Sequence, residues 1–157
     1  MSVAPTARMT ARRREREPII QFSVFTPNRL GRLHEIVRRL AQQEVHLVAL
    51  TVLDTTESTI LRFVVDDPDQ ARKLMNEHGF AFVESHVLAV ELAFERQLQD
   101  VLEALLEAEL NIHYIYPFLT RPGGKSALAL SIEHPDVAED ILTKHRFAVL
   151  HQGDISR

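Results

Sequence analysis

The chain has 157 residues and a mass of 17.9 kDa, which is enough for one ordinary domain or two small ones. Hydrophobic residues make up 45% and charged residues 25%, so disorder is excluded over most of the chain. The formal net charge of −4 argues against nucleic-acid binding driven by bulk charge, and the lack of Cys excludes disulfides, thiolate metal sites and Cys nucleophiles. No apolar run is long enough to span a membrane and no signal peptide follows Met1, so we expect a cytoplasmic protein.

The first 17 residues differ in composition from the rest. Residues 1–17 contain five Arg, two Glu and little apolar material, so they cannot bury a face of their own. We predict a disordered basic tail here. A solvated leader and a basic arm that binds an acidic partner are both compatible with this composition.

The remainder contains an internal repeat, which fixes the organisation of the fold. The segment from Pro68 to Ala71 matches Pro135 to Ala138, and the motif at His78 matches that at His145, both at an offset of 67 residues. Leu33, Leu40 and Glu44 match Leu98, Leu105 and Glu109 at an offset of 65. The extra two residues fall in the turn at 119–124, where a structural repeat tolerates insertion. We therefore predict two units, at residues 18–86 and 87–157.

In the first unit, β-branched and aromatic residues predict strands over 19–26, 45–53 and 59–65, with a fourth beginning at 80. The first predicted helix follows a breaker cluster at 27–31, and its apolar face is Leu33, Ile36, Val37 and Leu40. The second begins near Pro68 and ends at Gly79, and its face is Ala71, Leu74, Met75 and His78.

The second unit repeats this pattern. Strands are predicted from 87, over 111–118, over 126–132 and from 147, with helix faces at Leu98, Val101, Leu102, Leu105 and at Ala138, Ile141, Leu142, His145. The order βαββαβ, twice, predicts an α+β protein of two ferredoxin-like units side by side, each an antiparallel sheet with its helices on one face. The helix-free faces are also apolar, so we expect the other unit and a second chain to cover them, and hence a homodimer.

The loop at 26–31 joins a strand end to a helix start. Free backbone amides at a helix N-terminus bind carboxylates, and Gly31 allows a ligand to approach the backbone closely. Asn28 adds a side-chain donor and acceptor. From these residues alone, an ordinary helix cap with a packing Gly explains the loop as well as a ligand site does.

These features together resemble the ACT domain, a small-molecule regulatory module. The strand, the loop at 27–31, the amphipathic helix and Glu44-Val45-His46-Leu47 carry the resemblance, which covers residues 19–156 in two copies. The segments 61–68 and 121–125 are similar to those of the stand-alone tandem ACT proteins. The first copy has Leu30 where Pro is usual, and the second has Ala93-Phe94-Glu95-Arg96, without Gly, in place of the loop.

The resemblance implies that the second strands of the two units pair edge to edge in one eight-stranded sheet. It places an amino acid between the loop of one unit and the second strand of the other. The implied ligand-binding residues are Thr26, Asn28, Arg29, Leu30 and Gly31 from the first unit and Asn111 and His113 from the second. Because residues 93–96 lack the Gly and the polar side chain, we expect one site per chain.

The resulting hypothesis is a non-enzymatic regulatory protein that binds an amino acid and associates with itself or with an amino-acid metabolic enzyme. A ligand-independent oligomerisation module, or a regulatory subunit like the small subunit of acetolactate synthase, is the alternative. An RNA-recognition fold shares the element order, but its central strands need stacking aromatics that this chain lacks. No nucleophile motif, phosphate loop or H-x-x-x-H spacing is present, so we expect no catalytic site, cofactor or metal.

Overall fold

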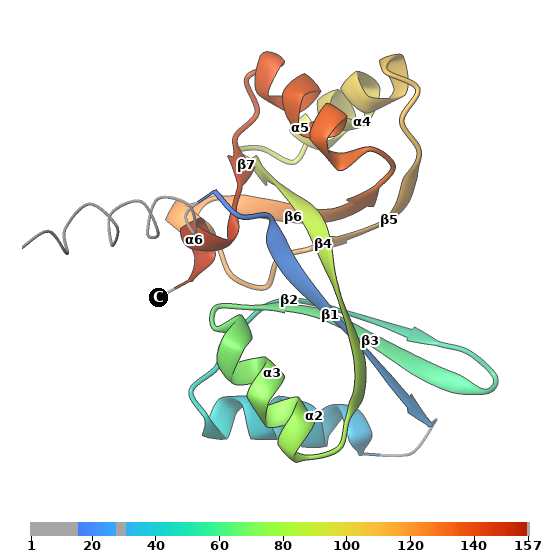
Figure 1. Ribbon diagram of the computed structural model, residues 1–157. Helices are drawn as coiled ribbons and strands as arrows, with labels where there is room; N and C mark the ends of the chain where they lie inside the picture. Colours follow the sequence, from blue (N-terminus) through green and yellow to red (C-terminus); the bar gives the residue numbers. More distant parts are fainter. Residues whose placement is uncertain (1–15, 28–30, 157) are drawn as a thin grey trace, which may run out of the picture.

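The computed structural model describes residues 16–27 and 31–156 (Figure 1). The first half contains β1 (Ile19–Pro27), α2 (Arg32–Gln42), β2 (Leu47–Asp54), β3 (Ser58–Val65), α3 (Pro68–Glu77) and β4 (Ala81–Leu92). The second half contains α4 (Gln97–Glu107), β5 (Ile112–Pro117), the short 3-10 helix η1 (Pro122–Gly124), β6 (Ser126–Ile132), α5 (Pro135–Lys144), β7 (Val149–Leu150) and α6 (Gln152–Ile155). The predicted helices and strands are present, with the strands expected from 80 and from 87 joined in β4, and the short helices η1 and α6 are the elements that periodicity did not predict.

In the described part of the chain, the strands form one sheet of seven in the order β2-β3-β1-β4-β6-β5, with β7 also on β4. Every pairing in it is antiparallel. The two ends of this order meet again, because Ala49 of β2 forms a bridge with Phe118, just after β5. The sheet therefore curls back on itself, and the predicted fold class of two ferredoxin-like units is confirmed.

One strand serves both units. The first half of β4 pairs with β1, ending at Val87 opposite Ile19, and the second half pairs with β6, beginning at Leu88 opposite Leu130. The expected boundary between residues 86 and 87 falls inside this strand. Sharing β4 explains why the sheet has seven strands rather than the eight that two separate units would bring.

The repeat is also visible in the backbone. Glu44 and Glu109 both adopt a left-handed φ of 57° after the first helix of their unit. Gly79 and Arg146, at φ 68° and 66°, take the same conformation after the second helix. Since left-handed residues other than Gly are uncommon, matched pairs at the sequence offsets of 65 and 67 show that the two halves end their helices alike.

The core has three parts, two of which lie between helices and sheet. The first, beneath α2 and α3, contains the buried residues Phe22, Val24, Ile36, Leu40, Val45, Leu61, Phe63, Val65, Ala71, Leu74, Met75 and Phe80. The second, beneath α4 and α5, contains Leu88, Val90, Leu92, Val101, Leu105, Leu130, Ile132, Ala138 and Leu142. In Figure 1 these helix pairs lie on opposite sides of the molecule with the strands between them.

The third part of the core lies between the helix-free faces of the two units, and we call this region the seam. Its buried residues are Ile19, Val48, Ala49, Val64, Val87, Ala89, Tyr116 and Ala129, from both units. The inner parts of these faces are therefore covered within one chain, without the second chain that we expected to contribute. Phe25, Leu53 and Val83, farther from the seam, remain 43%, 49% and 55% exposed.

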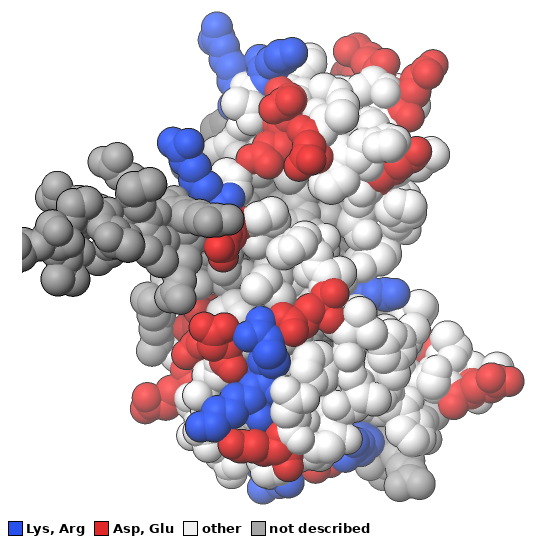
Figure 2. All heavy atoms as spheres, viewed as in Figure 1, with Lys and Arg blue, Asp and Glu red and all other residues white. Residues whose placement is uncertain are grey.

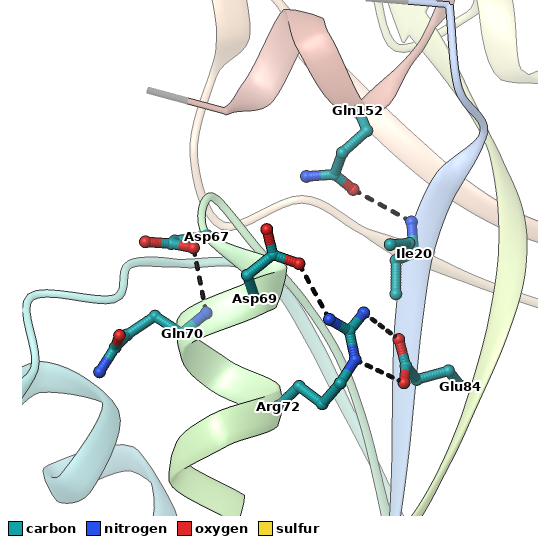
Figure 3. A network of polar contacts seen from close by, with 7 residues as sticks. All are labelled: Ile20, Asp67, Asp69, Gln70, Arg72, Glu84 and Gln152. Atoms are coloured by element: carbon teal, nitrogen blue, oxygen red, sulfur yellow. Dashed lines mark hydrogen bonds and ion pairs between the residues drawn. The ribbon is translucent and has the colours of Figure 1, made fainter. Parts of the chain in front are cut away.

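Helix α6, at the C-terminus of the second unit, is hydrogen-bonded to the first unit. Gln152 of α6, 7% exposed, accepts a hydrogen bond from the backbone N–H of Ile20 at 3.0 Å (Figure 3). Its side chain also donates to the carbonyl of Val65 at 3.2 Å, and its backbone N–H donates to Glu17 at 2.9 Å. One buried amide side chain thus joins α6 to both β1 and β3.

A second polar contact holds α3 against β4. The guanidinium of Arg72 donates to both carboxylate oxygens of Glu84, at 2.8 and 2.5 Å, and to Asp69 at 2.9 Å (Figure 3). The hydrogen bond from Arg72 lowers the pKa of Glu84 below its ordinary value. The bidentate geometry orients this helix on the strand that the two units share.

Candidate functional site

The strand–helix loop of the first unit lies between Thr26 and Gly31. Thr26, near the end of β1, is 3% exposed and lies opposite Thr59 of β3. Gly31 is the N-cap of α2 with φ 88°, and its carbonyl accepts the hydrogen bond of Glu35 N at 2.9 Å. Asn28, Arg29 and Leu30, which complete the predicted first half of the site, lie outside the described residues.

Gly31 is required by its backbone conformation. A Cβ placed on Gly31 would meet no atom within 4 Å, so space alone would admit a side chain. At φ 88°, however, a residue with a Cβ is strained. This corrects the reason inferred from the sequence: the left-handed turn into α2 requires Gly there, whether or not a ligand approaches.

The first turn of α2 carries donors and positive charge. The N-cap residue of α2 is Gly31, which has no side chain, so the N-cap position supplies no side-chain acceptor for the first amides of the helix. Arg32, the first helical residue, pairs with Glu35 at 2.8 Å and lies 4.6 Å from the ring centroid of Phe80. The hydrogen bond from Arg32 lowers the pKa of Glu35. An anion at this helix end would meet the first backbone amides of α2 and the favourable end of the helix dipole.

The equivalent loop of the second unit is closed by its own side chain. The backbone N–H groups of Ala93 and Phe94 both donate to Oε1 of Gln97, at 2.6 and 3.3 Å. The oxygen of Gln97 therefore already accepts from two backbone donors of this loop. At the repeat offset of 65, the residue matching Gln97 is Arg32, which has no acceptor atom. The first loop thus has no side chain at that position that could accept in the same way.

The predicted second half of the site lies at the start of β5. Asn111 and His113 are both exposed. The side-chain Nδ2 of Asn111 donates to the carboxylate of Glu133 at 3.1 Å. The backbone carbonyl of Asn111 accepts from the backbone N–H of Glu133 at 3.0 Å. Asn111 thus forms a polar pair with a carboxylate of its own unit.

The sheet topology places the two parts of the predicted site, the loop before α2 and the start of β5, relative to each other, although no direct contact joins them. Strands β1 and β2 run parallel because both pair antiparallel with β3, and β5 runs antiparallel to β2 at the Ala49–Phe118 bridge. The start of β5 and the end of β1 therefore lie toward the same end of the seam. Among the described residues, no hydrogen bond joins Thr26 or Gly31 to Asn111 or His113.

The seam contains a polar cluster that the sequence analysis missed. Gln21 of β1, fully buried, donates to the hydroxyl of Tyr114 at 2.6 Å and accepts from the hydroxyl of Tyr116 at 2.5 Å. Burial raises the pKa of Tyr116 above its ordinary value. A Gln among the apolar residues at the start of β1 and two Tyr spaced by two residues were the available signals, because residues two apart share one face of a strand.

Arg62 of β3 borders the same cluster. Its guanidinium carbon lies 4.3 Å from the ring centroid of Tyr114, and its buried Nε has no hydrogen-bond partner in the described structure. No carboxylate in the described ranges forms an ion pair with it. The seam therefore holds a positive charge beside Tyr114, close to the start of β5.

The described residues give less support to a metal site, a membrane-spanning helix or a basic binding surface. Among residues 16–27 and 31–156, no cluster of three or more His, Asp or Glu could hold a metal ion. No helix in this part of the chain is long and apolar enough to cross a membrane. On the face shown in Figure 2, Lys and Arg are interspersed with Asp and Glu and do not form one continuous basic surface.

Comparison with known proteins defines the family. The family model described as an ACT domain pair matches residues 18–157. Protein BT0572 from Bacteroides thetaiotaomicron is similar with a TM-score of 0.80 and 26% identity, over 89% of this chain and 96% of that one. The ligand-free regulatory subunit of aspartate kinase from Thermus thermophilus has a TM-score of 0.58 and 16% identity, over 82% and 91% of the two chains. At that identity the likeness concerns the fold alone. A comparison with curated proteins gives no match.

Proposed function

The chain belongs to the ACT domain pair family, and from this premise we propose that it is a non-enzymatic regulatory protein that binds an amino acid between its two units. The observation that carries the proposal is the contrast between the two strand–helix loops. The loop before α2 ends at Gly31, and the position that matches Gln97 is Arg32, which has no acceptor atom, whereas in the loop at 93–96 the amides of Ala93 and Phe94 already donate to Gln97. This contrast supports one site per chain, at the first loop.

The proposed site has two chemically different sides. Thr26, Asn28, Arg29, Leu30 and Gly31 form the side that binds the α-carboxylate, with the first backbone amides of α2 as donors. Asn111 and His113 form the side that binds the ammonium group. Because Nδ2 of Asn111 donates to Glu133, its Oδ1 is the side-chain atom that could accept from the ammonium, and Glu133 adds negative charge nearby. This arrangement complements a zwitterion.

The regulatory role follows from where this ligand would lie. A molecule held by both units links β1 and α2 to the start of β5, so it binds best when these elements lie close together, an arrangement that we call closed. A ligand shifts a conformational equilibrium only by its difference in affinity for the two states. We propose that the amino acid stabilises the closed arrangement, which then alters association with a second chain or with an amino-acid metabolic enzyme.

A thermal melting screen against the twenty amino acids tests the proposal. A ligand that binds only the folded chain, present at about 100 times its Kd, stabilises it by about 2.7 kcal/mol. For a chain of this size, the midpoint should then rise by about 5–10 °C. A small number of related amino acids should produce this shift, whereas a flat response to all twenty would contradict an amino-acid ligand.

An assembly role is the second candidate, and one observation favours it. The second unit has lost the features of the ligand loop and instead exposes Phe94, which is 62% exposed, at the same position. A surface of this kind is typical of a protein contact rather than of a small-molecule site.

A further inference from the structure

The outer face of α4 carries a continuous apolar ridge. Phe94, Leu98, Leu102 and Leu106 recur at intervals of four residues along one line of the helix and the turn before it. Phe94, Leu102 and Leu106 are 62%, 39% and 75% exposed, and the surrounding groove has a volume of about 1010 Å³. The adjacent side of α4, with Val101, Ala104 and Leu105, is buried against its own unit, and Leu98 packs against the same core. The apolar surface of the helix is therefore wider than the part that its own unit covers.

The fold itself does not require this ridge. At the repeat offset of 65, the matching line of α2 is Arg29, Leu33, Val37 and Ala41. That line begins with the charged Arg29 and ends with the small Ala41. Helix α2 nevertheless packs on its sheet as α4 does, so packing on the sheet does not need large apolar side chains at the two ends of this line. The large side chains on α4 are thus specific to the second unit, and exposed apolar ridges of this kind mark contact surfaces.

We propose that α4 is the contact helix of a twofold-symmetric homodimer and that the occupant of its groove is the α4 of a second copy. Side chains spaced by four form the ridges that interlock when two helices pack at about −50°. A twofold axis midway between Leu98 and Leu102 places Phe94 against the second copy's Leu106 and Leu98 against the second copy's Leu102. Each residue of the ridge then meets an apolar partner.

Two charged residues beside the ridge, Arg96 and Glu103, are consistent with the same twofold axis. Arg96 lies toward the N-terminal end of α4 and Glu103 toward its C-terminal end, and both line the groove. Neither forms an ion pair with another residue in the described part of the chain. In the antiparallel pair, Arg96 of each copy lies beside Glu103 of the other, so two ion pairs flank the apolar contact. The two helix dipoles also oppose one another, which is favourable.

Light scattering or sedimentation equilibrium on the full chain tests the dimer. We expect a particle of twice 17.9 kDa at concentrations of roughly 100 µM, because one helix pair is a small interface of micromolar affinity. Leu106→Glu and Phe94→Glu should each give a 17.9 kDa monomer with unchanged circular dichroism, since both side chains are largely exposed. Val83→Glu and Leu53→Glu are matched controls on the helix-free face and should remain dimeric.

A charge swap tests the twofold register. Arg96→Glu alone should weaken the dimer by about tenfold or more through repulsion from Glu103 of the second copy. The double variant Arg96→Glu/Glu103→Arg should recover most of that loss, because each pair is restored with its charges exchanged. A parent that stays monomeric, a dimer broken by Val83→Glu but not by Leu106→Glu, or a double variant no tighter than Arg96→Glu would each overturn the proposal.

Discussion

Single residues in the seam have an importance that only the three-dimensional structure shows. The sequence shows Gln21 as a polar residue in a largely apolar strand, and it gives no indication that two Tyr hydroxyls converge on its amide from β5. That convergence depends on how one unit packs against the other, which periodicity within a strand cannot reveal. By contrast, the local requirement for Gly at position 31 was predictable, although its physical reason is the left-handed φ.

Tyr116→Phe should reduce the stability of the chain. The substitution leaves the buried Oε1 of Gln21 without its donor, which costs about 1–2 kcal/mol at pH 7 by urea denaturation. Burial raises the folded-state pKa of Tyr116 above the unfolded value of about 10. Its contribution is therefore complete below pH 10 and declines as the pH rises further. If Tyr116→Phe has the same stability as the parent at pH 7 and the same alkaline dependence, the hydroxyl does not stabilise the seam.

At the scale of elements, the sequence predicted most of the structure because each long helix has one buried face and the strands are rich in β-branched and aromatic residues. The repeat added independent support by pairing α2 with α4 and α3 with α5. The strands expected at 80–83 and from 87 proved to be parts of one strand, β4, since Glu84-Ser85-His86 contains no residue that would break it. Helix α6 was missed because four residues are too few to show a period.

The left-handed residues after α3 and α5 give a prediction at this scale. Gly79 and Arg146 share this conformation, which is unstrained for Gly and costs other residues about 1 kcal/mol. We therefore expect Arg146→Gly to stabilise the chain by about 0.5–1 kcal/mol and Gly79→Ala to destabilise it by a similar amount. Lys144→Gly, at the last helical residue of α5, is the control and should be destabilising. A destabilised Arg146→Gly variant would mean that the Arg side chain contributes more than the backbone strain removes.

At the scale of the whole molecule, the two units are integrated rather than linked in series. They share β4, pack their helix-free faces together in the seam, and are joined again where α6 binds β1 and β3. The resemblance to ACT domains implied one continuous sheet for both units. It could not predict that the two faces would cover each other, because that depends on the curl of the complete sheet. We propose that the boundary between the units lies within β4, where its pairing partner changes.

This integration predicts one cooperative unfolding transition for the whole chain. Scanning calorimetry should show a single peak whose calorimetric and van't Hoff enthalpies agree. Gln152→Ala should lower stability by roughly 2–4 kcal/mol, because the buried N–H of Ile20 and carbonyl of Val65 lose their partner. Ser156→Ala, which removes a peripheral hydrogen bond of the same side chain, should have a much smaller effect. Two separated transitions, one for each half, would show that the units fold independently.

The central claim is that each chain has one amino-acid site, at the loop before α2. Isothermal titration calorimetry with the amino acid that gives the largest thermal shift tests it most directly. We predict a stoichiometry of one ligand per chain and an affinity that Asn28→Ala weakens by roughly tenfold or more, since a hydrogen bond to a charged group is lost. Gly31→Val should weaken binding further by straining the turn, whereas Ala93→Ser, in the loop that Gln97 closes, should bind as the parent does. Two ligands per chain, or an Asn28→Ala variant that binds as tightly as the parent, would contradict the claim.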